Sequence, residues 1–172
     1  MAGAPIVSTK TFQGIRVEVD TSISFDEVLS RLRRRMGEAS ARELVALAKE
    51  AVTEAEYAQK VQERFVGESG FVLFHEIDHG GWLPRFGVSR RVVRWILGNP
   101  LIAVTMIRHD IIAGLFAPVE ILVTEKGSGA GATIAYVRPS SLMVIEENPP
   151  LLEAAKALDE KLDALIANAT AA

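Results

Sequence analysis

The segment FVLFHEIDHGGWLPRFGVSRRVVRWILGNP (residues 71–100) sets the order of strands and helices for the rest of the chain. Its first eight residues are rich in aromatic and β-branched side chains, which predicts a strand at 71–78. Glycines and a proline then interrupt the pattern, and residues 92–97 again have strand composition. Gly98-Asn99-Pro100 has the composition of a helix start, with Asn99 as the N-cap residue. We therefore expect two strands joined by a loop and followed by a helix.

Capping signals and apolar spacing place the remaining elements. Ser24 and Glu27 have the Ser-x-x-Glu spacing of a capping box, and Ser40 and Glu43 repeat it. The predicted elements are, in chain order, a strand at 15–20, helices at about 25–36 and 40–65, strands at 71–78 and 92–97, a buried helix at about 100–109, strands at 119–124 and 133–138, and a helix at about 150–167. This pattern predicts a single α+β domain, residues 1–172, with a mostly antiparallel sheet.

Composition excludes several classes of protein and of site. The chain has 172 residues, of which 19 are Lys or Arg and 22 are Asp or Glu, so its net charge is −3. This balance argues against a nucleic-acid partner, which requires a basic surface. The absence of cysteine excludes disulfides, thiol nucleophiles and Cys-ligated metals. No apolar run reaches the roughly 18 residues of a membrane helix, so we expect a cytoplasmic protein with no membrane partner.

The motif His75-Glu76-Ile77-Asp78-His79 matches the His-Glu-x-x-His pattern of zinc proteases. That chemistry requires both histidines on one face of a helix. In the predicted strand, residues four apart are separated by about 13 Å, too far for them to bind one metal ion. A weaker metal hypothesis remains, in which Asp78 and His79 converge with the other His-Asp pair of the chain, His109 and Asp110. The simpler interpretation is that Asp78 caps a turn.

Arg108-His109-Asp110 directly follows the apolar helix predicted at 100–109. Ionisable side chains at this place must be paired, exposed or directed into a cavity, because burying them alone is costly. They could complement the negative end of the helix dipole and begin a turn. They could equally form a site in which Arg108 holds an anion and His109, oriented by Asp110, transfers a proton.

The first candidate function is a small-molecule-binding domain with an apolar pocket and anion-contacting polar groups. We expect the pocket where the end of the strand at 71–78 meets the helix that begins at Asn99. Free N–H groups near Asn99, together with Arg108 and Arg138, would contact the anion. The apolar lining would come from Phe74, Trp82, Trp95 and Met106.

The second candidate is a cofactor-free acid–base enzyme (a lyase, an isomerase or a hydrolase) in the same pocket. His79 or His109 would act as the general base. Asp78 or Asp110 would orient it, and Arg108 would hold the anionic group. The third candidate is an interaction protein that assembles through the helix at 40–65. We predict no cofactor for any of the three.

Three short segments, in this order and spacing, resemble a bacterial and archaeal family known as domain of unknown function 302. They are Glu76-Ile77-Asp78-His79, Ile96-Leu97-Gly98-Asn99-Pro100 and Leu115-Phe116-Ala117-Pro118-Val119. The resemblance implies an α+β fold of order β-α-β-β-α-β-β-α that often forms a homodimer, and it implies no activity. The family-like core spans about 71–141, and the helical segment at about 37–70 is an insertion relative to short members.

Overall fold

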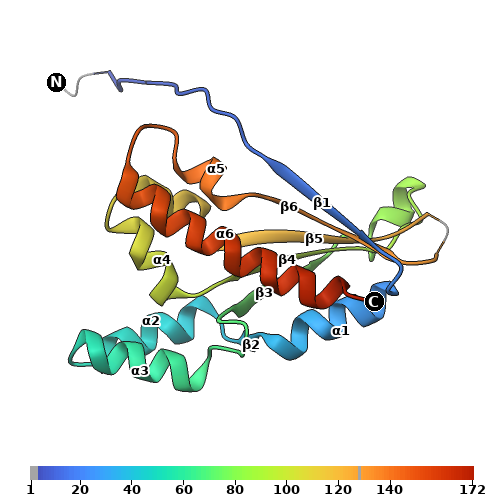
Figure 1. Ribbon diagram of the computed structural model, residues 1–172, viewed down its shortest axis with the longest axis horizontal. Coiled ribbons are helices and arrows are strands. Elements are labelled where there is room, and N and C mark those ends of the chain that lie inside the picture. The colour runs from blue at the N-terminus through green and yellow to red at the C-terminus, as the bar shows by residue number, and fades with distance from the viewer. Residues whose placement is uncertain (1–3, 128) are drawn as a thin grey trace.

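The computed structural model describes residues 4–127 and 129–172, and Figure 1 shows how their helices and strands are arranged. The strands are β1 (Arg16–Thr21), β2 (Gly37–Glu38), β3 (Val72–Asp78), β4 (Val92–Gly98), β5 (Val119–Glu125) and β6 (Ala132–Val137). The helices are α1 (Phe25–Arg35), α2 (Ala41–Glu50), α3 (Glu54–Arg64), α4 (Pro100–Ile107), α5 (Pro139–Met143) and α6 (Pro149–Thr170), with short 3-10 helices η1 (Leu83–Phe86) and η2 (Ile111–Phe116).

The strands form one sheet in the order β1-β6-β5-β4-β3-β2. All neighbouring pairs are antiparallel except β2 and β3, which are parallel. The predicted α+β class with a mostly antiparallel sheet is therefore confirmed. The strands predicted at 119–124 and 133–138 are β5 and β6, which form an antiparallel hairpin. Its connecting loop includes residue 128, which lies outside the described residues.

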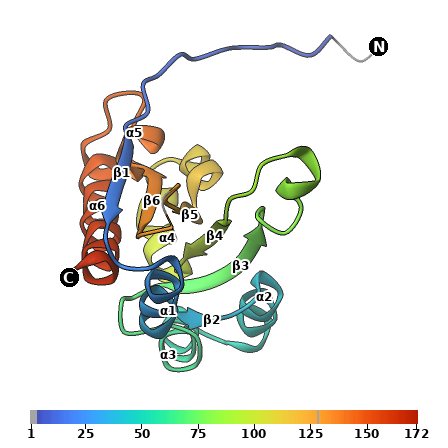
Figure 2. The same cartoon turned by 90° about the vertical axis from the view of Figure 1, so that its right-hand side faces the viewer.

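Helices α1 and α6 cover one face of the sheet, and the main core lies between them and the strands (Figure 2). Alternate residues of each central strand point into this core, as the two-residue period of a strand requires. Trp95 of β4, Ile121 of β5 and Ile134 of β6 are almost completely buried there. The facing helices contribute residues such as Val28 and Leu162, which are equally buried. Burial of this one face fixes the register of the strands.

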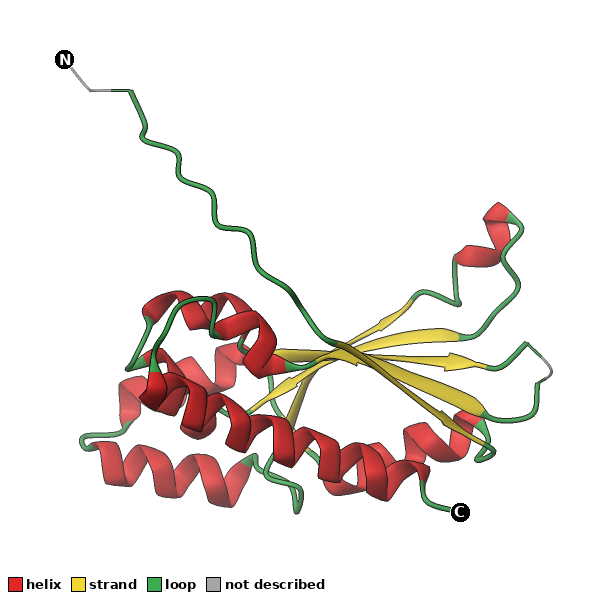
Figure 3. Ribbon diagram, turned by 45° about the horizontal axis from the view of Figure 1, so that its top comes forward, coloured by secondary structure: helices red, strands yellow, loops and turns green. Residues whose placement is uncertain are grey.

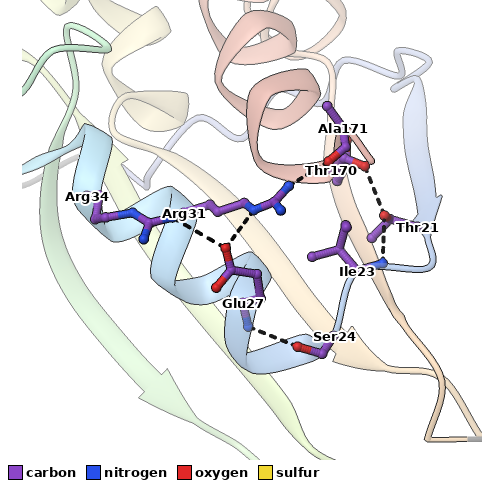
Figure 4. A network of polar contacts seen from close by, with 8 residues as sticks. All are labelled: Thr21, Ile23, Ser24, Glu27, Arg31, Arg34, Thr170 and Ala171. Atoms are coloured by element: carbon purple, nitrogen blue, oxygen red, sulfur yellow. Dashed lines mark hydrogen bonds and ion pairs between the residues drawn. The ribbon is translucent and has the colours of Figure 1, made fainter.

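Polar contacts join the C-terminal end of α6 to the connection between β1 and α1 (Figure 4). The Thr21 hydroxyl donates to the Thr170 carbonyl over 2.9 Å, and Arg31 of α1 donates to the Ala171 carbonyl over 2.5 Å. Glu27 holds the Arg31 guanidinium in place at 2.8 Å. The last carbonyls of a helix lack partners within it, so these side chains satisfy the end of α6.

The opposite face of the sheet, called here the open face, has no helix packed over its middle in the described residues (Figure 3). Its side chains come from the alternate positions of the same strands. Ile96, Leu122 and Ala135, at its centre, are half-buried. Helices α4 and α5 with η2 lie beyond one end of the sheet, and the loop that contains η1 projects beyond the other end (Figure 3).

Two predictions about helices are wrong. The helix predicted at 40–65 is divided into α2 and α3, because Thr53 accepts a hydrogen bond from the Glu56 amide and caps a new helix. Thr53 and Glu56 have the same capping spacing that marked the other two helices. The helix predicted to be buried at 100–109 is α4, in which Val104 is 42% exposed and Met106 is buried. Helix α4 lies at the end of the sheet, so only one side of it packs against the rest of the protein.

No helix in the described parts of the chain is long and apolar enough to cross a membrane.

Replacement of Leu162 by alanine tests the packing of α6 on the sheet. Leu162 is fully buried, whereas Leu152 of the same helix is 36% exposed. We expect Leu162→Ala to lower the free energy of unfolding by about 2–5 kcal/mol, since it removes buried methyl groups and leaves a cavity. Leu152→Ala, the matched control, should lower it by about 1 kcal/mol or less. Urea denaturation followed by circular dichroism measures both, and equal effects would contradict this account of the core.

Candidate functional site

The two His-Asp pairs singled out in the sequence lie at opposite ends of the sheet. In the antiparallel register of β3 and β4, Asp78 pairs with Val93 and Val72 pairs with Gly98. The end of β3 is therefore separated from the start of α4 by most of a strand, about 20 Å. The pocket predicted where residues 71–78 end and α4 begins does not form, because α4 adjoins the beginning of β3 instead (Figure 1). The weaker metal hypothesis is wrong for the same reason, because Asp78 and His79 do not converge with His109 and Asp110.

The residues of the His-Glu-x-x-His match lie on β3 and just after it, as the strand interpretation predicts. The Asp78 carboxylate accepts a hydrogen bond from the Gly81 amide at 3.1 Å and so caps the turn after the strand. The His79 ring packs edge-on against Trp82, with ring centroids 5.7 Å apart. Among the described residues, no group of three or more His, Asp or Glu is placed to hold a metal ion.

Arg108, His109 and Asp110 have structural contacts at the end of α4. Arg108 is exposed and donates from Nε to the Val104 carbonyl at 3.2 Å. The carboxylate of Asp110 accepts from the Ile112 amide at 2.9 Å and begins η2. The side chain of His109 is exposed. This arrangement corresponds to the turn and dipole interpretation of the sequence.

The predicted lining residues do not share a cavity. Asn99 is buried, and it caps α4 through the Leu101 amide while donating to the Gly70 carbonyl. Trp95 and Met106 belong to the main core. Phe74 packs instead on the smaller core beneath α2 and α3, and Trp82 is 48% exposed in the η1 loop. Each of these side chains therefore has a packing or hydrogen-bonding role near the element that carries it, except Trp82, which lies in the η1 loop.

Arg138 belongs to a polar network between the end of β6 and α6. Its guanidinium lies 3.1 Å from the Asp163 carboxylate and 3.9 Å from that of Asp159. Tyr136 donates its hydroxyl hydrogen bond to Asp163. The buried Asp159 accepts from both the amide and the hydroxyl of Ser140, at 3.0 and 2.5 Å. These contacts fasten α5 and the sheet to α6, so Arg138 is committed to carboxylates of the chain itself.

A cavity of about 460 Å³ lies elsewhere, on the open face over β5 and β6, and is called here the open-face pocket. Its floor includes Leu122 and Ala135, and its end walls come from η2 and α5. The lining residues are Arg16, Arg94, Leu115, Phe116, Pro118, Val119, Glu120, Ile121, Leu122, Ala135, Tyr136, Val137, Pro139 and Leu142. Most of this lining is apolar.

The residues before β1 support one wall of the open-face pocket. The ring of Phe12 packs edge-on against Phe116, with centroids 6.1 Å apart. The Ile15 amide donates to the Ser141 hydroxyl at 2.9 Å, which ties this segment to α5. Gly14 lies so close to Val137 and Leu142 that a Cβ there would approach them to 3.3–3.4 Å. This close approach keeps the wall narrow and apolar.

Two arginines contribute charged side chains to the lining of the open-face pocket. Arg94 donates from Nε and Nη2 to one oxygen of Glu120, and both residues line the pocket. Arg16, at the strand edge, lies 2.8 Å from Glu18. The floor and end of the pocket are apolar, and the two arginines flank the floor from opposite sides, on β1 and β4. This combination suits a molecule that is apolar over most of its surface.

Sequence reasoning missed this pocket, although a signal was present. Residues 119–124 and 133–138 were predicted to be strands of a mostly antiparallel sheet, in which the positions of a solvated face are normally polar. Leu122, Ala135 and Val137 occupy such outer positions and are apolar. An apolar residue on the outward face of two adjacent strands indicates a surface that is covered or that binds something.

Comparison with known proteins places the chain in a family. Residues 48–169 match the family model described as domain of unknown function DUF302. The chain belongs to this family. The match to DUF302 begins within α2 and ends in the last turn of α6. No curated protein matches.

A crystal structure of an uncharacterized conserved DUF302 protein from Bacillus stearothermophilus has a similar fold. It superimposes with a TM-score of 0.61 at 19% sequence identity, covering 90% of this chain and 97% of that one. The similarity extends the fold to another DUF302 protein and says nothing of activity. The homodimer that the resemblance implies stays a prediction.

The alkaline stability of the protein tests the contact between Tyr136 and α6. Burial raises the pKa of Tyr136, and its hydrogen bond to Asp163 raises that pKa further. In the unfolded chain the hydroxyl titrates near its ordinary value of about 10. Because the folded state holds this proton more tightly, its contribution is complete below that pH and is lost as pH rises above it.

We therefore expect the free energy of unfolding to fall with pH above about 10. The fall should be shallower in Tyr136→Phe, which lacks the titrating hydroxyl. Urea denaturation at a series of alkaline pH values measures the slope. An unchanged slope in the variant would show that the titration of Tyr136 does not limit stability.

Proposed function

We propose that this DUF302 protein binds a small organic molecule with an apolar body and one anionic group in the open-face pocket. The observation that carries the proposal is the pocket itself, about 460 Å³ in volume with a mainly apolar lining. Cavities that hold small organic ligands are commonly about 300–1,000 Å³ and have few polar groups. The proposal keeps the chemical class expected from the sequence and moves the site to a different part of the fold.

The apolar body of the ligand is expected to lie on Leu122, Ala135 and Val137, between the end walls. These side chains are half-buried on a face that carries no helix in the described residues. A ligand that covered them would remove apolar surface from water, which is the main favourable term in such binding. Leu115, 75% exposed on η2, lies at the edge of the pocket and would gain the same contact.

The anionic group is assigned to the side of the pocket that carries Arg94. This guanidinium uses Nε and Nη2 for Glu120, so Nη1 is not part of that ion pair. An incoming carboxylate or sulfonate could accept from the arginine in a charge-assisted hydrogen bond. Arg16, on the opposite side of the floor, is paired with Glu18, so the assignment of the anionic group rests on Arg94.

An acid–base enzyme is less well supported by the same geometry. Among the described residues that line the open-face pocket, none is a histidine. His79 and His109, the expected bases, lie beyond opposite ends of the sheet. Binding therefore explains the pocket with fewer assumptions than catalysis.

Two fluorescent probes of matched shape test the pocket. These are 8-anilinonaphthalene-1-sulfonate, with apolar rings and one sulfonate, and N-phenyl-1-naphthylamine, which lacks the sulfonate. We expect Ala135→Phe, which fills the floor, to weaken binding of both probes by about tenfold or more. Thr124→Phe is the matched control, because Thr124 lies on the same face of β5, two residues beyond Leu122 and outside the lining. Fluorescence titration gives the dissociation constants.

The same two variants separate a ligand from a second copy of the chain on this face. Native mass spectrometry should show the same oligomeric state for the wild type, Ala135→Phe and Thr124→Phe. If both phenylalanine variants bind the probes as the wild type does, the open-face pocket is not the binding site. If Ala135→Phe instead changes the oligomeric state, the face is occupied by another protomer and the proposal fails.

Exchange of either partner in the Arg94–Glu120 ion pair tests the assignment of the anionic group. We expect Arg94→Gln to weaken binding of the sulfonate probe by about tenfold and that of the neutral probe by about twofold or less. Glu120→Gln removes the competing carboxylate and should strengthen binding of the sulfonate probe. Equal effects of Arg94→Gln on both probes would place the anionic group elsewhere.

A further inference from the structure

The connection between β3 and β4, residues 79–91, forms a projecting loop that contains η1 and is called here the η1 loop. It extends away from the end of the sheet, clear of the helices (Figures 2 and 3). Its large apolar side chains face solvent, with Trp82 48%, Phe86 76% and Val88 43% exposed. An exposed cluster of this kind on a projecting loop is typical of a surface that contacts a partner.

The η1 loop is ordered by contacts of its own. The amides of Trp82 and Leu83 both donate to the His79 carbonyl, at 3.2 and 3.1 Å, and the Gly87 amide donates to the Pro84 carbonyl at 3.1 Å. Gly87 has a φ of 80°, a left-handed conformation that suits glycine and ends η1. These backbone donors are paired within the loop, so they lose no partner when water is excluded.

The aromatic rings of the η1 loop are packed on one another. Trp82 lies edge-on to His79 on one side and to Phe86 on the other, with centroids 5.7 and 6.0 Å apart. These two contacts support the indole at the surface. Rings that are already positioned lose little conformational entropy on contact with a partner.

The charge of the η1 loop is positive. Residues 79–91 contain no Asp or Glu and three arginines. Arg91 is paired with Asp26, and Arg90 donates to the Glu125 carbonyl at the base of the loop. Arg85 lies within η1 itself, next to Phe86, and is exposed. A cation beside exposed aromatic and aliphatic side chains is complementary to a surface with an apolar interior and an anionic outer layer.

We propose that the η1 loop is a peripheral membrane contact, which places Trp82 and Phe86 in the interfacial layer of an anionic lipid bilayer. Tryptophan favours this layer, where its ring is in an apolar environment and its N–H remains near water. Anionic headgroups attract Arg85 and Arg90, which are exposed and have no carboxylate among their described partners. The expectation of no membrane partner rested on the lack of a spanning segment, and a peripheral contact needs none.

A bilayer fits the loop better than a nucleic acid does. The exposed rings pack edge-to-face on their neighbours, whereas base stacking requires ring faces presented at intervals along a basic groove. The η1 loop projects beyond one end of the sheet. Elements η2 and α5, which form walls of the open-face pocket, lie beyond the other end. This proposal therefore does not rest on the proposed ligand.

Tryptophan fluorescence reports directly on the η1 loop. The chain has two tryptophans, and Trp95 is fully buried in the core whereas Trp82 is at the surface. The experiment titrates the full chain with phosphatidylcholine vesicles containing about a quarter phosphatidylserine. We expect a blue shift of the emission and protection from iodide quenching, both absent in Trp82→Phe. Pure phosphatidylcholine vesicles should bind about tenfold more weakly, and added salt should weaken anionic binding.

Two matched substitutions locate the contact. Phe86→Ser removes a ring that is 76% exposed, and Ile111→Ser removes an aliphatic side chain that is 74% exposed on η2, at the other end of the molecule. We expect Phe86→Ser to weaken vesicle binding by about tenfold or more and Ile111→Ser to leave it unchanged. Circular dichroism should show that both variants fold, since neither side chain belongs to a core.

Several outcomes would overturn the proposal. These are no change in Trp82 emission with anionic vesicles, equal binding to neutral vesicles, or equal loss of binding in Ile111→Ser and Phe86→Ser. A protein oligomer that Phe86→Ser dissociates, with no vesicle binding, would assign the loop to a protein contact instead. Vesicle binding lost in Phe86→Ser while the Ala135→Phe variant still binds vesicles would separate this contact from the open-face pocket.

Discussion

Burial of a single face of the sheet under α1 and α6 is the constraint on which the rest of the structure depends. Trp95, Ile121 and Ile134 point to that face, so the side chains at alternate positions of β4, β5 and β6 must point away from it. Helices α1 and α6 are enough to cover one side. The other side is then free to carry the open-face pocket, without any cost to the packing of the core.

A second requirement is that α5 and the end of β6 stay fixed against α6. Asp159 and Asp163 supply this from one helix, because residues four apart lie on the same side of it. One carboxylate holds Ser140 at the start of α5, and the other holds Tyr136 and Arg138. Since α5 forms a wall of the open-face pocket, a network on the helix-covered side determines the shape of a cavity on the open side.

The strands and most helix ends could be predicted from sequence because they depend on local signals. Ser24, Ser40 and Asn99 cap helices as expected, and residues 71–78 form a strand despite their protease-like motif. The division at Thr53 was locally encoded and was overlooked. The two-residue strand β2 depends on pairing with β3, and α5 on the carboxylate of Asp159, so neither has a local signal.

The candidate site was less predictable, because it depends on which strand ends meet. The weaker metal hypothesis required Asp78 and His109 to converge, whereas the register of β3 with β4 separates them. In the register of β4 with β5, Arg94 lies opposite Leu122, and Glu120 lies opposite Ile96. In each of these two pairs, one outward-facing side chain is charged and the other is apolar. A continuous apolar face of this size would promote aggregation, so the ion pair limits it to the part enclosed by η2 and α5. The polar groups that make the open face compatible with water are thus the same groups that give the open-face pocket its charge.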